Sequence, residues 1–479
     1  MEEHLNNVEN PEVATEKAKT EETAAIDEAA KETLNETSES ADAKANENVG
    51  EEKIENENTE KQPEEEVVYF RDTEFIDKYP DFVIDEEDIV KVVISGYYGF
   101  NNIGDEAVLM SIIQKLKNTI RGVEIIVLSN NPEETARLYD VKACDRWNFK
   151  EITKAIQESK ILISGGGSLL QDVTSIKNVI YYLAIIQIAL RNKKKVLVYS
   201  QGIGPLNKAI SRVMVKHTLN KVSGIYVRDR GSAMLLRSIG VKNVDESIDP
   251  VLGLQTSSTE TPTPVADKSI GVFIRPWKND DKIVQDMTLG LANMVKKGYK
   301  LYFIPMYFEQ DLEISKKLEK MVIQKLAEEE VEPNTETLEA PLTIAEVVAY
   351  IKKFNMVVGM RLHSLIIAAA NGIPMVGVSY DPKVVNFLKE IEVDTFVETD
   401  HMSSSEFNRE MTKVERYQEK LHNNLEYARQ IAQARLNLPV RRLIDLACLT
   451  VWDEQRMIMD PVLRMPDTQT VMFDPERRR

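Results

Sequence analysis

The sequence places an arginine, a histidine and a serine close together in residues 359–364, Gly-Met-Arg-Leu-His-Ser. An apolar run precedes this stretch and small apolar residues follow it, which predicts a strand, a loop and the start of a helix. In open α/β folds such a loop lies at the carboxyl edge of the sheet, where ligands bind. Arg361 offers a permanent positive charge, His363 a proton near neutral pH, and Ser364 a hydroxyl. These groups suit phosphate or carboxylate chemistry, although Arg361 could instead pair with a carboxylate of the protein and His363 could bind a backbone carbonyl.

Three other charged residues follow predicted strands in the same way. Asp105 comes after the glycine-rich turn 95–104 and could act as an acid or a base, although it could also cap the helix that follows. Arg228 and Arg275 each end a predicted strand, where a guanidinium can bind a carboxylate or a phosphate through two hydrogen bonds. For Arg228 the alternative is an ion pair with Asp229, and Trp277 could stack on a sugar ring or simply pack.

A glycine-rich loop formed by Gly165, Gly166, Gly167 and Ser168 lies between a predicted strand and a helix that includes residues 179–190. Backbone N–H groups in such a loop can surround an anion, helped by the helix dipole. The loop lacks the spacing of a dinucleotide-binding motif, so a tight turn is the alternative. No group of histidine, cysteine or carboxylate residues has the spacing of a metal site, and we expect no metal.

The elements that position these residues repeat in one pattern of strand, loop and helix. The pattern runs over residues 89–262 and again over 267–398, with a polar, proline-containing boundary at 256–264. It predicts two Rossmann-like, doubly wound α/β domains with a cleft between them, as in the glycosyltransferase B fold. C-terminal helices are expected over 399–453, as one helix at 405–434 and another at 436–453, before an irregular tail at 454–479.

Charge and composition divide the chain of 479 residues further. The net charge of −18 comes from residues 1–88, which we expect to be a disordered acidic tail and linker, and the rest carries roughly +4. The tail could bind a partner or be a solvated spacer. The body has no nucleic-acid-binding signature. Two cysteines, no signal peptide and no apolar run long enough to span a bilayer predict a cytoplasmic protein that could still touch the membrane surface.

Several motifs occur in one order along the chain, and together they resemble bacterial polysaccharide pyruvyl transferases. In the first half of the chain they are Gly-Tyr-Tyr-Gly at 96–99 with Asn-Ile-Gly-Asp-Glu at 102–106, Ser-Gly-Gly-Gly-Ser at 164–168 with Gln-Asp at 171–172, Ser-Gln-Gly-Ile-Gly-Pro at 200–205, and Val-Arg-Asp at 227–229. In the second half they are Arg-Pro-Trp at 275–277 and Gly-Met-Arg-Leu-His-Ser at 359–364. The resemblance covers about residues 90–445 and is strongest to the cell-wall type, which modifies the polymer that anchors S-layer proteins. The two ends of the chain lie outside it.

The resemblance implies a two-Rossmann fold and the transfer of pyruvate from phosphoenolpyruvate, a co-substrate, to a sugar, with a cyclic ketal formed and phosphate released. The implied acceptor is a lipid-linked disaccharide that contains N-acetylmannosamine, with the ketal across its 4- and 6-hydroxyls. No cofactor is expected. Arg228, Arg361 and His363 should lie at the phosphoenolpyruvate site, and Asp105 near the acceptor. His363 would deliver a proton at neutral pH and Asp105 would act as the base.

These inferences predict catalytic roles for His363, Asp105 and Arg228. Substrate-binding roles are predicted for a larger set, namely Arg361, Ser364, Arg275, Asn102 and the loop Gly165–Ser168. Two other functions stay open: a glycosyltransferase of the same fold that uses a sugar nucleotide, and a non-catalytic scaffold for envelope assembly. The sequence leaves the acceptor sugar, the linkage and the oligomeric state undetermined, and the protein could work at the inner face of the cytoplasmic membrane.

Overall fold

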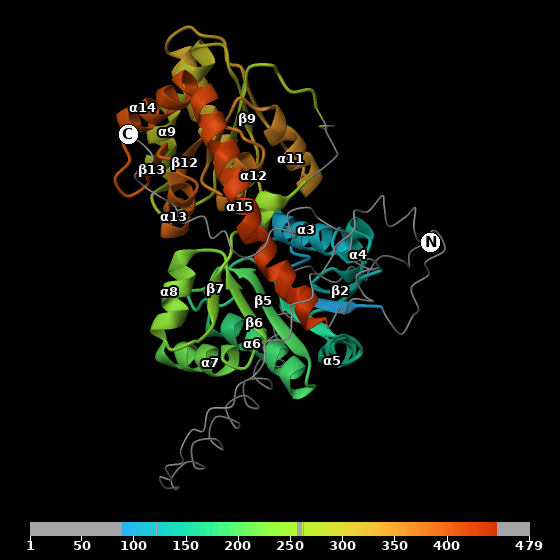
Figure 1. Cartoon of the computed structure of the whole chain (residues 1–479). Helices are drawn as coiled ribbons and strands as arrows, with labels where there is room; N and C mark the ends of the chain where they lie inside the picture. The colour runs from blue at the N-terminus through green and yellow to red at the C-terminus, as the bar shows by residue number, and fades with distance from the viewer. Residues whose placement is uncertain (1–88, 121, 174, 256–260, 262, 448–479) are drawn as a thin grey trace, which may run out of the picture.

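The computed structural model describes residues 89–120, 122–173, 175–255, 261 and 263–447. The expected acidic tail at 1–88 and the irregular tail at 454–479 lie outside these residues, as does most of the polar boundary at 256–264. Figure 1 shows two α/β lobes, one above the other, and a long helix near the C-terminal end of the described chain that runs between them.

The first lobe is built on a seven-stranded sheet in which every neighbouring pair of strands is parallel. The strand order is β3-β2-β1-β4-β5-β6-β7, which is the Rossmann order with one added strand. The strands are β1 (Lys91–Ser95), β2 (Glu124–Ser129), β3 (Lys142–Asp145), β4 (Ile161–Ser164), β5 (Lys195–Gln201), β6 (Gly224–Val227) and β7 (Val244–Glu246). The helices are α3 (Ile103–Lys117), α4 (Pro132–Tyr139), α5 (Phe149–Glu158), α6 (Ile176–Arg191), α7 (Ala209–Leu219), α8 (Arg230–Ser238) and the short η2 (Pro250–Gly253).

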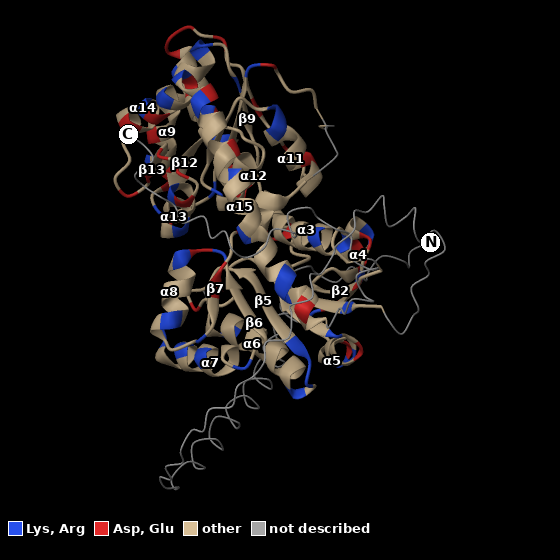
Figure 2. Ribbon diagram, in the orientation of Figure 1, with Lys and Arg blue, Asp and Glu red and all other residues tan. Residues whose placement is uncertain are grey.

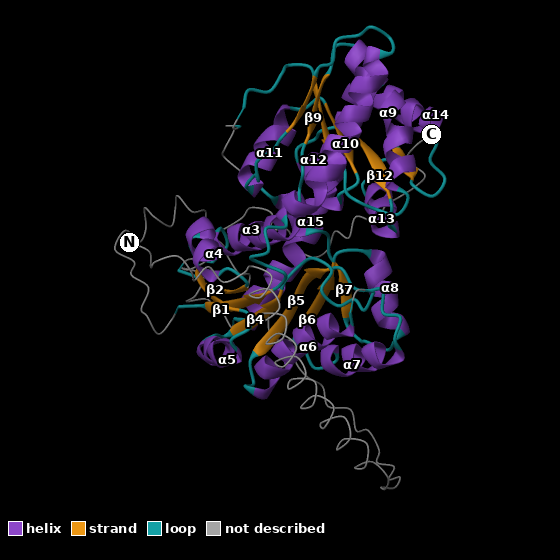
Figure 3. Cartoon of the chain, turned by 180° about the vertical axis from the view of Figure 1, so that it is seen from behind, coloured by secondary structure: helices purple, strands orange, loops and turns teal. Residues whose placement is uncertain are grey.

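The second lobe repeats this arrangement with a six-stranded parallel sheet of order β10-β9-β8-β11-β12-β13. The strands are β8 (Ser269–Phe273), β9 (Lys300–Phe303), β10 (Thr335–Thr337), β11 (Met356–Gly359), β12 (Met375–Ser379) and β13 (Phe396–Glu398). The helices are α9 (Asp280–Lys296), α10 (Phe308–Ala327), α11 (Ile344–Lys353), α12 (Leu362–Ala370) and α13 (Pro382–Glu390). Figure 3 shows helices flanking both sheets. The predicted fold class, two doubly wound domains arranged as in glycosyltransferase B enzymes, is confirmed by this topology.

Local sequence signals explain where many of the helices begin. Asn131, Asn148 and Asp229 each precede a helix, and their side chains accept a hydrogen bond from a backbone N–H of the first turn. Thr343 and Glu346 form a reciprocal capping box at the start of α11. The central strands of both sheets are almost wholly buried apolar runs, as expected where helices cover both faces of a parallel sheet.

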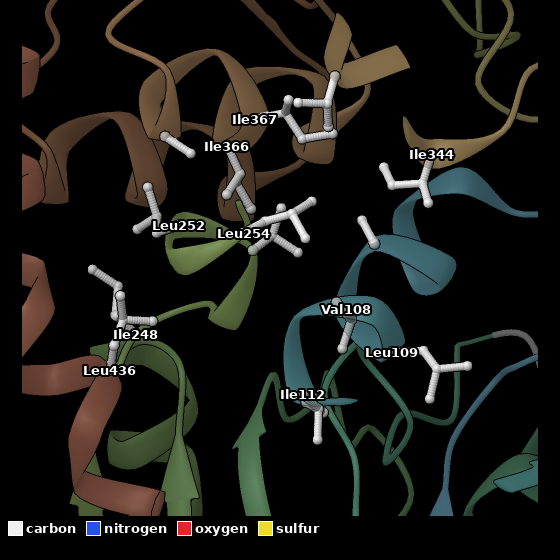
Figure 4. Close-up of a cluster of buried hydrophobic side chains, with 14 of the residues drawn as sticks. Val108, Leu109, Ile112, Ile248, Leu252, Leu254, Ile344, Ile366, Ile367 and Leu436 are labelled. Atoms are coloured by element: carbon white, nitrogen blue, oxygen red, sulfur yellow. The ribbon is translucent and has the colours of Figure 1, made fainter. Parts of the chain in front are cut away.

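The two lobes share one apolar core. Figure 4 shows side chains from α3 of the first lobe facing side chains from α12 and α11 of the second, with the segment that joins the lobes between them. Val108, Ile112, Leu252, Ile366 and Leu436 are among its buried members. This shared core fixes the position of one lobe against the other, because separating the lobes would expose the apolar side chains to water.

The C-terminal helices α14 (Ser404–Arg416) and α15 (Gln418–Leu446) correct the predicted break at residue 435. The break falls at Tyr417, and α15 continues through Pro439. A proline leaves the carbonyl four residues earlier without its helical partner. Here that carbonyl, on Arg435, accepts a hydrogen bond from the Ser247 hydroxyl at 3.0 Å, so the helix continues and packs on β5 and β6 of the first lobe. Within the described ranges, no helix is long and apolar enough to cross a membrane.

Candidate active site

A cavity of about 750 Å³ lies where the carboxyl ends of the two sheets meet. In each sheet the order in which strands are added reverses between two central strands, β1 and β4 in the first lobe and β8 and β11 in the second. The loops that follow these four strands line the cavity. The charged lining residues are mostly cationic, namely Arg146, Lys177, Arg228, Arg275, Arg361 and Lys383, with Asp105 as the one carboxylate among the lining residues described. Figure 2 shows basic residues on α8 and α13, one helix from each lobe, where the lobes approach each other.

Arg228 and His363, predicted from separate motifs, share one partner. The buried guanidinium of Arg228 donates to Asp249 at 3.0 Å and to the Ser168 hydroxyl at 3.0 Å. The same Asp249 oxygen lies 3.8 Å from Nε2 of His363, which has no hydrogen-bond partner among the described residues. His363 comes from the second lobe and its Nδ1 packs on Gly104 of the first, so closely that a Cβ atom on Gly104 would lie 2.3 Å away. The imidazole is therefore held between the lobes.

The pKa of His363 is not suited to proton exchange at neutral pH in the protein alone. Burial lowers this pKa to about 4, the neighbouring positive charges add to the shift, and Asp249 opposes it. The expectation that His363 carries a proton near pH 7 is therefore wrong for the protein without bound substrate. With this pKa the imidazole is neutral at pH 7.

Arg361 occupies the cavity wall contributed by the second lobe, as predicted. Its guanidinium binds both oxygens of Asp311, through Nε at 3.0 Å and through Nη2. Asp311 is fully buried, and it also accepts hydrogen bonds from the backbone N–H groups of Met306 and Tyr307. This two-point contact fixes the plane of the guanidinium in the cavity.

Asp105 stands on the first turn of α3 and faces the same cavity. It is not the helix cap, because the Asn102 side chain accepts the hydrogen bond from the Gly104 N–H. Burial raises the pKa of Asp105 to about 7, and Glu106 adds to the shift, whereas Arg228 and Lys383 oppose it. A carboxyl with this pKa exchanges protons at neutral pH, so Asp105 has the property that the sequence suggested for His363.

Arg275 lines the cavity beside Tyr380, to whose hydroxyl it donates at 3.0 Å. Trp277 is outside the lining residues and packs against the Tyr380 ring, with ring centroids 4.8 Å apart. Of its two predicted roles, packing is the one observed. The described residues contain no group of three or more histidine, cysteine, aspartate or glutamate side chains that could hold a metal ion.

Comparison with known families decides the relationship. A family model described as polysaccharide pyruvyl transferase matches residues 102–382, which is more than half of the chain and includes Asp105, Arg228 and His363. The chain belongs to the polysaccharide pyruvyl transferase family. The family predicted from the sequence motifs is confirmed, whereas the cell-wall type stays a prediction.

Individual relatives of this pyruvyl transferase family member are distant. The amylovoran biosynthesis protein AmsJ of Erwinia amylovora is 22% identical over 268 residues, which is 51% of this chain and 62% of that protein. The chain thus matches less than two thirds of that relative's length. Among solved structures, UDP-GlcNAc 2-epimerase from Neisseria meningitidis bound to UDP-GlcNAc is 16% identical with a TM-score of 0.49, covering 74% of this chain and 100% of that one. The UDP-GlcNAc 2-epimerase from Methanocaldococcus jannaschii is 12% identical with a TM-score of 0.49, covering 68% and 92%.

Part of the predicted site of this family member lies outside the cavity wall. Ser364 is fully buried and donates its hydroxyl hydrogen bond to the Arg361 carbonyl, so it shapes the loop instead of lining the cavity. Gly165 and Gly166 are also absent from the wall, and a Cβ atom there would collide with Tyr98 and Val108 respectively.

Gly167, Ser168 and Asn102 do line the cavity. The helix that was expected directly after the glycine-rich loop begins only at Ile176. The proposed help from a helix dipole is therefore wrong, because the loop does not open the helix. Gly167 has a φ of +85°, which favours glycine, and it lies against the Asp105 carboxylate.

The sequence reasoning missed the carboxylates that hold the arginines and one whole wall of the cavity. Asp249 follows β7 at the carboxyl edge of its sheet, so the rule applied to the other loops could have found it. Asp311 lies on α10 with no such signal. The remaining wall consists of aromatic rings around Arg146, which stands in a short strand-to-helix connection without a recognisable motif.

Proposed function

We propose that this protein transfers pyruvate from phosphoenolpyruvate to a saccharide, forming a cyclic ketal and releasing phosphate. The observation that carries the proposal is the pairing of Arg228 with Asp249 and of Arg361 with Asp311, from opposite lobes, around His363. Family membership agrees with it. Phosphoenolpyruvate is small and carries a carboxylate and a phosphate, and two guanidinium groups held in fixed planes suit two such anions.

The donor would bind at the cationic part of the cavity, between Arg228 and Arg361. Arg275 and Lys383 add positive charge there, and the residues that hold the two main arginines, Asp249 and Asp311, do not line the cavity. The guanidinium groups are already fixed by protein contacts, so substrate binding would not have to order them.

The reaction balances with two acceptor hydroxyls. The first hydroxyl loses its proton to Asp105 as its oxygen bonds to C2 of phosphoenolpyruvate, while C3 gains a proton from protonated His363 and becomes a methyl group. The second hydroxyl then bonds to C2 as the bond from C2 to the phosphate oxygen breaks, and its proton leaves with the phosphate. A carboxyl with a pKa of about 7 is well matched to the first step.

His363 would act on the donor side of this reaction. A phosphate group beside the imidazole would raise the pKa of His363, because an adjacent negative charge favours the protonated ring. We therefore propose that the substrate itself converts His363 from a neutral group into a proton donor. The acceptor we propose is a lipid-linked N-acetylmannosamine-containing disaccharide, reached from the cytoplasmic face of the membrane.

The test is phosphate release from phosphoenolpyruvate, with and without a synthetic N-acetylmannosaminyl-N-acetylglucosamine acceptor on a short lipid diphosphate. We expect release that requires the acceptor, loss of release in His363→Ala, and normal release in His401→Ala, which removes an exposed histidine. Binding of phosphoenolpyruvate without release would mean that the acceptor is a different sugar. If phosphoenolpyruvate neither binds nor is turned over, the proposal is refuted. That result would favour a sugar-nucleotide glycosyltransferase, which a thermal-shift screen with nucleotide sugars would detect.

A further inference from the structure

The cavity has a second end that the donor chemistry does not use. Five aromatic rings surround the Arg146 guanidinium there, at 4.7 to 5.8 Å from guanidinium carbon to ring centroid. We call this group the aromatic wall, formed by Tyr97, Phe100, Trp147, Tyr181 and Tyr182. All five rings and Arg146 line the cavity.

Arg146 is an unusual centre for such a wall because it is buried without a carboxylate. Only 3% of the residue is exposed, and the contacts described for its side chain are to the Gly96 carbonyl at 3.0 Å, the Tyr182 hydroxyl at 3.3 Å and the rings. Its Nε has no hydrogen-bond partner among the described residues. Burying a charge in this way is costly unless the neighbouring π faces stabilise it. The arrangement therefore holds the rings in fixed orientations around a cation.

Three of the five rings are the more exposed ones. Tyr181 and Tyr182 are the buried members of the wall, whereas Tyr97, Phe100 and Trp147 are only partly buried. Tyr97 and Phe100 stack in parallel with centroids 4.0 Å apart, and the Trp147 indole N–H is held by Asn130. Flat, fixed aromatic surfaces of this kind bind the apolar face of a ring-shaped ligand at little entropic cost.

The aromatic wall adjoins Asp105. Tyr97 and Phe100 stand in the loop between β1 and α3, and Asp105 stands on the first turn of α3, so one short segment brings all three to the cavity. Toward the donor end, a Cβ atom on Gly167 would lie 2.8 Å from Oδ1 of Asp105, and the next residue, Ser168, accepts a hydrogen bond from Arg228. Asp105 therefore lies between the two ends of one cavity, and about 750 Å³ is ample for a small donor together with a sugar ring.

We infer that the aromatic wall is the subsite for the acceptor sugar, which stacks on Tyr97, Phe100 and Trp147 with a hydroxyl directed at Asp105. This inference rests on the proposed function, and it assigns the two substrates to opposite ends of the cavity. Arg146 is a positioning residue in this assignment, since it acts through the rings that it holds.

The kinetic test uses Phe100→Ala and Trp147→Ala in the phosphate-release assay. Each change should raise the KM for the synthetic acceptor about tenfold, which is the loss of one stacking contact, and leave the KM for phosphoenolpyruvate within twofold of wild type. Phe149→Ala is the matched control, because Phe149 packs edge-on against Tyr181 but does not line the cavity. Arg146→Lys keeps the charge without the planar stacking surface and should shift the acceptor KM in the same direction.

An acceptor KM that stays within twofold of wild type in both aromatic variants would overturn the inference. An equal rise in both KM values would overturn it as well, because the wall would then not separate the two substrates. Melting curves show which variants are folded, and the two aromatic variants test the inference independently.

A binding measurement separates this inference from the proposed function. The chain has three tryptophans, so Trp277→Phe with Trp452→Phe leaves Trp147 as the fluorescent reporter in the cavity. The synthetic acceptor should quench Trp147 fluorescence whether or not phosphoenolpyruvate is turned over, and phosphoenolpyruvate alone should not. Quenching without phosphate release would refute the proposed reaction and support the sugar subsite, whereas release without quenching would refute the subsite alone.

Discussion

Replacing Asp105 with asparagine should make the protein more stable and inactive at once. Burial raises the pKa of this carboxyl from 3.8 to about 7. A carboxyl whose pKa is raised by folding destabilises the folded state when it ionises. That cost is absent below the unfolded pKa of 3.8 and complete above the folded pKa of about 7. Asparagine cannot ionise, so the cost disappears.

The size of the effect follows from the pKa shift. A shift of roughly three units corresponds to about 4 kcal/mol of unfolding free energy at pH 8.5, at 1.36 kcal/mol per unit. At pH 5, where the folded carboxyl is mostly protonated, the same shift costs only about 2 kcal/mol. These figures are upper bounds, because the amide of asparagine must also be accommodated in the cavity.

The assay compares melting temperatures of wild type and Asp105→Asn at pH 5 and pH 8.5, alongside phosphate release. The variant should melt at a higher temperature than wild type, by a margin that widens with pH, and should release little phosphate. Asp311→Asn is the matched control in the same site. It removes the charge that pairs with Arg361 and should lower the unfolding free energy by about 3 kcal/mol. A margin for Asp105→Asn that is the same at both pH values would refute the claim that ionised Asp105 is destabilising.

Three further predictions concern the pH profile, the imidazole and the long helix. If Asp105 is the base, kcat/KM for phosphoenolpyruvate rises as pH increases through about 7, and a flat profile from pH 6 to 8 would exclude that role. Gly104→Ala should lower kcat about 100-fold, because the new Cβ displaces His363; activity near wild type would show that the imidazole position is not critical. Ser247→Ala should lower the unfolding free energy by about 1–2 kcal/mol without changing either KM, since the Arg435 carbonyl loses its partner; an unchanged melting temperature would contradict this.

The fold could be predicted from the sequence because its signals are local. Strands buried on both sides are continuous apolar runs, helices begin at capping side chains, and the alternation of the two dictates parallel sheets. The four edge strands, β3, β7, β10 and β13, are the part of the sheets that the sequence pattern did not predict. They lie toward the sheet edges and span only three or four residues, so their pairing depends on a neighbouring strand and not on their own composition.

The chain by itself determined which loops carry the chemistry, since the carboxyl ends of parallel strands must meet at one edge. Arg228, Arg361, His363 and Asp105 were found in this way, and all four line one cavity. Only the tertiary structure decided the protonation states of His363 and Asp105. The pKa of His363 is lowered and that of Asp105 raised because burial between the two lobes penalises the charged form of each. Burial of this kind, like the aromatic wall around Arg146, is created only when segments far apart in the chain pack together, and no local pattern of residues encodes it.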